Sequence, residues 1–351
     1  MNISYHPNYT NSDSFSSSGF YIAASFLFLI WFFGCFNNFL AILAIVSDRC
    51  LRTPMNGILL NLSLSDLSIS ALGTPLSFIA ALNQRWPFGQ FLCYSYGFFM
   101  TLTGMTAVGT VTVIAVERYI ILSRHYQSVG LTKEKAVACI VCIWIYSLSM
   151  SLPPLFGWNR YILETPGIAC SVDWETKSVT NTSYIIYIFI LGYFAPVLIM
   201  ASCYGKVIYI VCKGPKMIKN KKKAKAEQRV TMMAAAMVVC TLTAWTPYAV
   251  VSLMVTTGYS HLIGPIASVA PAIFAKTSVI YNPIVYFFLN TQVNKSLKKK
   301  FQRRSIRERN EDFSVTTNYF YTVDSIKPTV AVATSVPIKS KKSLKTDTSK
   351  V

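Results

Sequence analysis

Charged residues are scarce in this sequence, and acidic residues are the scarcest among them. Only 13% of the 351 residues are charged, with 33 Lys and Arg against 14 Asp and Glu. A typical soluble domain is about a quarter charged, so this composition argues against one. The nine cysteines include no two Cys-x-x-Cys pairs, which excludes the common zinc-binding pattern.

A cleavable signal peptide and internal repeats are also absent. The opening segment, residues 1–18, is rich in Ser and Asn, and no basic stretch in it leads into a short apolar core. We therefore expect this segment to remain on the mature protein as a polar tail. Without inverted repeats, and with few charges inside the apolar runs, a transporter or channel is the least expected function.

Long apolar runs dominate the sequence instead. Residues 19–46 contain no Asp, Glu, Lys or Arg, and about 20 apolar residues suffice to cross the hydrocarbon core of a bilayer. Six comparable runs follow at 55–82, 92–116, 136–157, 184–212, 230–256 and 262–289. The sequence therefore predicts an all-α membrane protein, a seven-transmembrane helix bundle over residues 19–290.

Lys and Arg are concentrated in two segments that we expect to face the cytosol. Residues 213–229 hold eight of them and residues 298–304 hold five, and short loops with a basic excess stay cytoplasmic. Seven crossings then place the N-terminus outside, where Asn2 and Asn8 are candidate glycosylation sites. The basic residues behind the net charge of +19 lie beside the membrane spans, where they meet anionic lipid headgroups. We therefore expect no nucleic-acid partner.

The chain after the seventh run divides into two parts. Residues 291–304 alternate basic and apolar residues, which predicts a short amphipathic helix on the membrane surface. Residues 305–351 are polar and rich in Ser, Thr and Lys, and we expect a disordered cytoplasmic tail with hydroxyls open to phosphorylation. No cysteine follows Cys240, which excludes a palmitate anchor on the amphipathic helix.

Two ionisable residues, Asp66 and Lys276, lie well inside predicted spans. A charge at the centre of a membrane helix costs about 2.5–3.5 kcal/mol, so each invites a functional interpretation. Asn38 and Asn282 offer Asp66 polar partners, which favours a structural or ion-linked switch. Lys276 has no acidic residue in the sixth or seventh run to neutralise it. A desolvated lysine can form a Schiff base with an aldehyde, although it could also merely face a watery bundle interior.

Prolines interrupt three of the predicted spans: Pro196 in the fifth, Pro247 in the sixth and Pro283 in the seventh. Neighbouring polar groups make such kinks tolerable in membrane helices. Each kink could act as a hinge, or it could serve static packing only.

Several segments, in order and on the right spans, resemble the motifs of rhodopsin-class G-protein-coupled receptors, and the resemblance covers about residues 19–304. The motif segments are Leu51–Asn56, Asn61–Asp66, Glu117–Tyr119, Trp245–Tyr248 and Asn282–Tyr286. Within that class, Phe274–Ser278 resembles the retinal-attachment segment of opsins. Pro154–Trp158 and Cys170–Trp174 are similar to the opsin loop that covers retinal, and Asn290–Gln292 is near the tripeptide of ciliary-type, encephalopsin-like opsins.

The resemblance implies a light-activated receptor rather than an enzyme. Retinal would be held in its 11-cis form as a Schiff base on Lys276, and light would isomerise it to all-trans. The implied pocket residues are Tyr96, Thr101, Gly104, Tyr193, Trp245 and Tyr248. Movement of the sixth helix below Pro247 would then open the cytoplasmic face to a G protein. The implied switch residues are Glu117, Arg118, Tyr119, Glu227, Asn282, Pro283 and Tyr286, and Asn38 and Asp66 form a polar core.

A protonated Schiff base needs a nearby negative charge. Tyr96 stands where vertebrate visual pigments carry a glutamate, so the outer loop must supply one. Cys93 and Cys170 both face the oxidising side, which predicts a disulfide, and Glu164 lies six residues before Cys170. If the disulfide draws this loop over the pocket, Glu164 can act as counterion. The alternative is a solvated Glu164 paired with Arg160.

The expected partners are a heterotrimeric G protein of the inhibitory or transducin type, a receptor kinase and arrestin on the tail, and membrane lipids. The expected location is the plasma membrane, including a ciliary membrane. Two departures from the family pattern affect the sixth helix: Ala244 replaces a usual cysteine, and Thr241 replaces a common aromatic residue. Two other functions stay open, a receptor for a diffusible ligand in which Lys276 is incidental and a retinal photoisomerase that does not signal.

Overall fold

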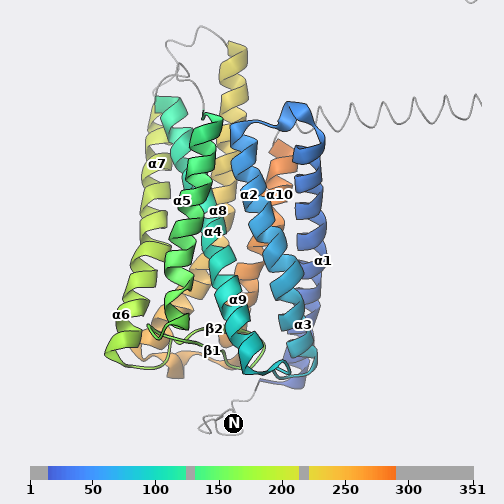
Figure 1. The fold of residues 1–351 in the computed structure, drawn as a ribbon, viewed down its shortest axis with the longest axis vertical. Coiled ribbons are helices and arrows are strands. Elements are labelled where there is room, and N and C mark those ends of the chain that lie inside the picture. The colour runs from blue at the N-terminus through green and yellow to red at the C-terminus, as the bar shows by residue number, and fades with distance from the viewer. Residues whose placement is uncertain (1–14, 124–130, 213–220, 290–351) are drawn as a thin grey trace, which may run out of the picture. The chain divides into compact units, whose positions relative to one another are not determined.

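The computed structural model describes residues 15–123, 131–212 and 221–289 (Figure 1). Seven helical segments in this part of the chain are long and apolar enough to cross a membrane. They are Ser17–Ser47, Pro54–Leu82, Gly89–Ser123, Lys133–Leu155, Val179–Ile210, Glu227–Thr257 and Pro265–Leu289. The predicted seven-helix fold class is confirmed. The third segment runs seven residues past the predicted end at 116, because Glu117 and Arg118 end the uncharged run without ending the helix.

Some spans consist of more than one helical element. The long helices are α1 (Ser17–Ser47), α2 (Pro54–Ser68), α3 (Thr74–Leu82), α4 (Gly89–Ser123), α5 (Lys133–Ser151), α6 (Val179–Ile188), α7 (Ala195–Cys212), α8 (Lys221–Thr257), α9 (Pro265–Lys276) and α10 (Ser278–Leu289). A π-helical turn, Ile69–Gly73, joins α2 to α3, and another, Phe189–Phe194, joins α6 to α7. Such turns rotate the residues that follow them and often occur at functional sites.

Local sequence explains where several helices begin. Thr53 caps α2, its hydroxyl accepting the Asn56 N–H at 3.2 Å, and Pro54 follows at the first helical position. Ser178 caps α6 by accepting the Asn181 N–H at 3.1 Å. These caps satisfy N–H groups that have no partner within their own helix.

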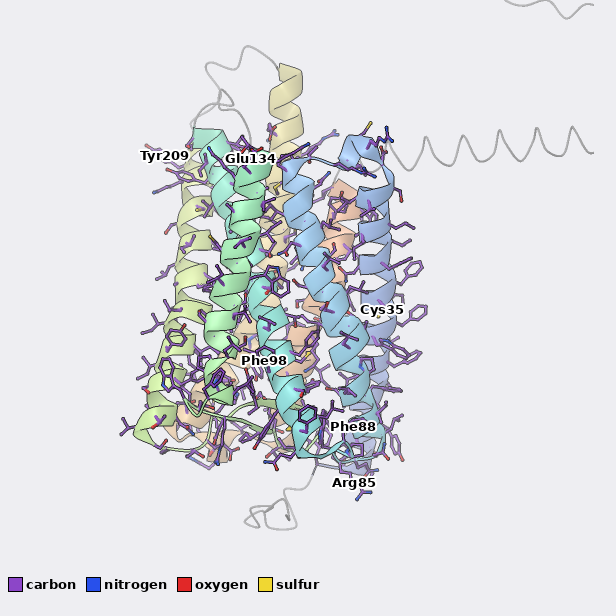
Figure 2. All side chains as sticks on the ribbon, in the orientation of Figure 1. Cys35, Arg85, Phe88, Phe98, Glu134 and Tyr209 are labelled. Atoms are coloured by element: carbon purple, nitrogen blue, oxygen red, sulfur yellow. A yellow bond between two sulfur atoms is a disulfide. The ribbon has the colours of Figure 1, made fainter. Side chains whose placement is uncertain are left out.

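The helix α4 occupies the centre of the bundle, in contact with α2, α5, α7 and α8. A polar link fastens it: the Asn61 amide donates to Thr110 Oγ1 at 2.9 Å, and its oxygen accepts from Trp144 Nε1 at 2.9 Å. Asn61 is buried between these partners. The outward face of α1 is apolar, since Phe28 and Phe32 are exposed there, and Figure 2 shows side chains projecting from the outer sides of the helices. A lipid environment suits such faces.

A short β-hairpin lies across the end of the bundle at which α4 begins (Figure 1). It pairs β1 (Tyr161–Leu163) antiparallel with β2 (Cys170–Val172), an element that the helical periodicity did not predict. The predicted disulfide between Cys93 and Cys170 is confirmed and ties β2 to α4. Gly97 lets the hairpin approach, because a Cβ there would lie 2.5 Å from the Tyr161 ring.

Several predictions concern residues outside the described ranges. They are residues 1–14 of the polar tail, with its sequons at Asn2 and Asn8, the amphipathic helix at 291–304 and the tail at 305–351. These remain predictions.

Candidate functional site

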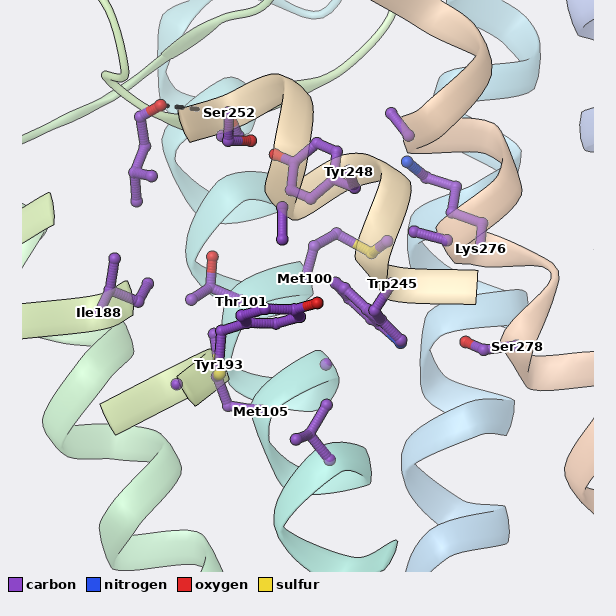
Figure 3. A pocket seen from close by; sticks show the side chains of 18 of the residues that line it. Met100, Thr101, Met105, Ile188, Tyr193, Trp245, Tyr248, Ser252, Lys276 and Ser278 are labelled. Atoms are coloured by element: carbon purple, nitrogen blue, oxygen red, sulfur yellow. Dashed lines mark hydrogen bonds between the residues drawn. The ribbon is translucent and has the colours of Figure 1, made fainter. Parts of the chain in front are cut away.

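One large cavity lies among α4, α7, α8 and α9, with residues of β2 along its outer end (Figure 3). All six residues that the sequence placed in a pocket line this cavity, and so do Lys276 and Glu164. The six are Tyr96, Thr101, Gly104, Tyr193, Trp245 and Tyr248. Most of the remaining wall is apolar, as in Met100, Met105 and Phe189. An apolar ligand with one polar end would suit such a cavity.

Lys276 stands at a break in the seventh span. The helix α9 ends at Lys276 and α10 begins at Ser278. Between them the Thr277 N–H bonds to the carbonyl of Phe274 at 3.0 Å, three residues back rather than four. Figure 3 shows the Lys276 side chain extending from this break into the cavity, on the opposite side of Trp245 from Tyr193.

Glu164 is held over the same cavity by the loop between the two strands. Its backbone N–H bonds to the Ala169 carbonyl at 2.9 Å, and its carbonyl accepts the Gly167 N–H at 2.6 Å. Its carboxylate oxygen Oε1 accepts the Tyr248 hydroxyl at 2.8 Å. A second, smaller cavity is also lined by both Glu164 and Lys276. The carboxylate and the amine therefore border the same two spaces.

The alternative pairing of Glu164 with Arg160 is wrong. Arg160 Nε instead donates to Asp173 Oδ2 at 2.9 Å. Asp173 also accepts the backbone N–H of Glu175 at 3.1 Å and of Thr176 at 3.0 Å. Burial alone would raise the pKa of the Asp173 carboxyl, but the hydrogen bonds from Thr176 and Arg160 outweigh burial and hold that pKa below its usual range.

Asp173→Asn should therefore lower thermal stability at neutral pH, by about 1–3 kcal/mol, because it weakens a buried, charge-assisted network. A depressed folded-state pKa contributes stability that is present above the unfolded value of about 3.9 and lost as pH falls through the folded value. The difference between wild type and variant should shrink as the pH drops below about 4. Thermal unfolding of purified protein across pH measures it, with Glu175→Gln as the exposed control. A difference independent of pH would contradict this explanation.

Trp245 and Gly104 meet across the cavity. A Cβ on Gly104 would lie 3.1 Å from Trp245 Cη2, so glycine provides the room for the indole. Beside them, the Tyr193 hydroxyl donates to Thr246 Oγ1 at 2.9 Å, and Thr246 donates to the Leu242 carbonyl at 2.6 Å. This bond joins the fifth and sixth spans next to Pro247.

The hydroxyl of Tyr96 is engaged away from Glu164. It lies 2.6 Å from Ser77 Oγ, and Tyr96 as a whole is buried. Its neighbour Trp86 packs edge-on against its ring, with centroids 5.3 Å apart. Tyr96 thus lines the cavity without supplying a negative charge.

The cytoplasmic end of α4 carries a buried ion cluster. Arg118 pairs with the adjacent Glu117, and its Nη1 lies 2.9 Å from Glu227 Oε2 on α8. The Arg118 side chain is only 4% exposed, so the two carboxylates provide the partners that a buried charge requires. Tyr119 is half-buried, and Lys206 Nζ of α7 lies 5.2 Å from its ring centroid.

The polar core joins three spans. Asn282 Nδ2 donates to Asp66 Oδ2 at 2.9 Å. The sequence suggested Asn38 as a partner of Asp66, but Asn38 does not bond to it. Asn38 instead donates to the carbonyls of Val279 at 2.8 Å and Gly34 at 2.9 Å. The amide oxygens of Asn38 and Asn282, the second carboxylate oxygen of Asp66 and the Tyr286 hydroxyl are buried without a protein partner. Pro283, next to Asn282, is buried in the same helix.

Apart from Tyr193 in the π-turn and Glu164 in the hairpin loop, the sequence did not identify the cavity residues that these two elements contribute. Phe189 and Gly192 lie in the π-turn, and Ser171 lies in β2. A π-turn shifts the facing of the residues after it, and a three-residue strand leaves no periodicity to detect. Met100 and Met105 on α4 could have been found, since they lie one residue from Thr101 and Gly104 respectively.

Comparison with known proteins agrees with this arrangement. Residues 37–286 match the model of the seven-transmembrane receptors of the rhodopsin family. Opsin-3 of Mus musculus is 35% identical over 298 residues, which are 84% of this chain and 74% of that protein. A rhodopsin of Mizuhopecten yessoensis described as GQ-coupled is 30% identical, over 85% of this chain and 63% of its own.

A solved structure agrees as well. The crystal structure of squid rhodopsin superposes with a TM-score of 0.80 at 30% identity, covering 86% of this chain and 90% of that one. The region that the family model matches, residues 37–286, contains all seven membrane spans except residues 17–36 of α1 and 287–289 of α10. This chain belongs to the rhodopsin family of seven-transmembrane receptors, as an opsin: a light-sensing, multi-pass membrane receptor that couples to G proteins and is not an enzyme.

Proposed function

We propose that this opsin binds 11-cis retinal through a Schiff base on Lys276, and that isomerisation to the all-trans form by light opens its cytoplasmic face to a G protein. The observation that carries the proposal is the placing of one primary amine, Lys276, and one carboxylate, Glu164, on the wall of a single apolar cavity. Retinal when bound supplies the absorption of visible light and the change of shape.

The residues present fit such a group. Condensation of the Lys276 amine with an aldehyde forms a C=N bond and releases water, which requires a nucleophilic amine in a desolvated site. Protonation of that nitrogen creates a positive charge, and a carboxylate nearby stabilises it. We assign this counterion role to Glu164, and we assign Tyr248 to orient it by donating at 2.8 Å.

Trp245 is suited to transmit a change of ligand shape to the sixth span. It packs closely against Gly104, because a Cβ on that residue would lie only 3.1 Å from the indole. Its helix is weakened two residues later, at Pro247, which cannot donate a backbone hydrogen bond. A push on the indole would therefore turn α8 about Pro247.

The ion cluster on α4 would resist this movement until light arrives. Arg118 holds α8 through Glu227, at 2.9 Å. Separating this pair costs energy, because Arg118 is buried and Glu227 is one of its two carboxylate partners. That cost would keep the cytoplasmic face closed in darkness, and a G protein bound in the opened face would offset it. We assign Glu117, Tyr119, Asn282, Pro283 and Tyr286 to the same switch.

The decisive test uses membranes that contain the protein with and without added 11-cis retinal. Light should accelerate guanine-nucleotide exchange on an added G protein only in the loaded membranes. A receptor for a diffusible ligand would gain no long-wavelength absorbance from retinal. A photoisomerase would convert retinal in light without accelerating exchange, and either result would reject the proposal.

We further predict coupling to the inhibitory or transducin group. In transfected cells given retinal, light should lower cyclic AMP, and pertussis toxin should abolish the effect. The chain is also similar to a rhodopsin described as GQ-coupled, so signalling through the phospholipase pathway is the alternative to measure beside it. A light-driven calcium rise that resists the toxin would contradict the prediction. Lys276→Ala is the control and should give no response to light.

Four further assignments rest on residues outside the described ranges or on the family alone. We propose glycans on Asn2 and Asn8, a receptor kinase and arrestin acting on residues 305–351, contact of residues 291–304 with anionic lipid, and a plasma-membrane or ciliary location with the N-terminus outside. The basic content of residues 298–304 supports the lipid contact.

A further inference from the structure

The π-turn of the fifth span contains a backbone carbonyl that its own helix does not satisfy. The Ala195 N–H, which an α-helix would direct to the Leu191 carbonyl, bonds to the Ile190 carbonyl instead. The next hydrogen bond of this five-residue pattern would join the N–H of residue 196 to Leu191. Residue 196 is a proline and has no N–H. The Leu191 carbonyl therefore needs a donor from another element, because an unpaired backbone group is costly inside a membrane.

Tyr146 of α5 supplies that donor. Its hydroxyl donates to the Leu191 carbonyl at 2.7 Å, an ordinary length for a bond between a hydroxyl and a carbonyl. The Tyr146 ring packs over Gly109 of α4, where a Cβ would lie 3.6 Å from two of its carbon atoms. A side chain of the fourth span thus replaces the backbone bond that Pro196 prevents in the fifth.

The same π-turn carries part of the cavity wall. Phe189, Gly192 and Tyr193 all lie in the turn and line the cavity. Gly192 packs closely against α4, since a Cβ there would lie 3.0 Å from Met105 Cε. A π-turn changes the direction in which the surrounding residues face. The shape of the cavity therefore depends on the hydrogen bonds that hold this turn.

The π-turn is also bonded to the sixth span. The Tyr193 hydroxyl donates to Thr246 Oγ1 at 2.9 Å, and Thr246 precedes Pro247, the proposed hinge of α8. One residue of the turn, Leu191, is thus held by α5, and another, Tyr193, holds α8. Displacement of the turn would weaken the bond from Tyr193 to Thr246.

We propose that Tyr146 is a positioning residue of this receptor: it fixes the π-turn and thereby keeps Tyr193 bonded to Thr246 in darkness. Tyr146 is not among the described residues that line the cavity, so it acts through the turn and not by touching a ligand. The inference deepens the proposed function and rests on it. Loss of the Tyr146 hydroxyl should loosen the turn and let α8 open more readily about Pro247.

The first measurement needs no retinal. In membranes that contain the protein alone, backbone amides of residues 189–194 should exchange hydrogen for deuterium about 3–10-fold faster in Tyr146→Phe than in the wild type, the effect of losing one net hydrogen bond. Tyr187→Phe is the matched control. Its hydroxyl also joins α6 to α5, by bonding to Ser149 Oγ at 3.1 Å, but it lies outside the π-turn and the cavity lining. It should leave this exchange unchanged.

The second measurement asks whether Tyr146 acts through Tyr193. In darkness, with 11-cis retinal bound, Tyr146→Phe and Tyr193→Phe should each raise guanine-nucleotide exchange on an added G protein by about 3–10-fold. The double variant should rise no further than Tyr193→Phe alone, because both substitutions remove the same bond to Thr246. Tyr187→Phe should keep the low exchange of the wild type.

Three results would overturn the inference while leaving the attachment at Lys276 intact. They are unchanged amide exchange in Tyr146→Phe, unchanged guanine-nucleotide exchange in that variant, and a double variant whose effect is the product of the two single effects. Failure of the wild type to attach retinal would instead reject the proposed function. The amide exchange, measured without retinal, would then still decide whether Tyr146 holds the π-turn.

Discussion

Glu164→Gln is expected to move the dark absorption of the retinal-loaded protein toward the near ultraviolet at neutral pH. The substitution removes the carboxylate that borders the same cavities as Lys276. A protonated Schiff-base nitrogen in a dry site is disfavoured when its counterion is removed. An opposite charge at about 4–6 Å changes the pKa of such a group by about 1–3 units. The titration midpoint of the visible band should fall by that amount.

Two controls separate the counterion from its surroundings. Tyr96→Phe should leave the spectrum and its titration nearly unchanged, because the Tyr96 hydroxyl is engaged with Ser77. Tyr248→Phe should give a smaller shift than Glu164→Gln, since it removes only the hydrogen bond that orients the carboxylate. If Glu164→Gln left spectrum and titration unchanged, or if the wild type absorbed only in the ultraviolet, the assignment would be wrong.

A loop counterion also predicts how the photoproduct behaves. Glu164 is fixed by backbone hydrogen bonds in the strand-connecting loop, and the disulfide ties that loop to α4. Straightening of the ligand does not need to move it. We therefore expect a photoproduct that persists and that a second wavelength converts back, which difference spectra taken after two successive illuminations would record.

Lys276→Ala is expected to abolish pigment formation altogether. Without the amine no covalent linkage can form, so addition of 11-cis retinal should yield no band beyond that of free retinal. Lys206→Ala is the matched control, because Lys206 is the lysine of the fifth span and lies over Tyr119, away from the cavity. It should bind retinal as the wild type does. A Lys276→Ala protein that still bound retinal covalently would reject the attachment site.

Much of the architecture was predictable because each feature depends on a short stretch of sequence. The length and apolar content of residues 19–46 alone predict a membrane span, and in the structure this span is the helix Ser17–Ser47. The disulfide between Cys93 and Cys170 followed from orientation, since both cysteines had to face the oxidising side. The pocket residues came from motif resemblance, and all six line one cavity.

Other features depend on contacts between distant segments, which no local pattern encodes. Asn38 and Asp66 were expected to be partners because both are polar and intramembrane, yet Asn38 bonds to the Val279 carbonyl. Arg160 was a plausible partner for Glu164, but the hairpin turns it toward Asp173. The Thr241 hydroxyl is buried without a hydrogen-bond partner, and this depends on packing that the sequence does not specify.

The proposed attachment of retinal to Lys276 is tested most directly by identifying the lysine that carries it. Purified protein is loaded with 11-cis retinal in darkness, illuminated, reduced with borohydride and digested, and the retinyl-bearing peptide is identified by mass spectrometry. We predict one retinyl group, on the peptide that contains Lys276. A retinyl group on any other lysine, or none on a protein that has formed a visible band, would contradict it.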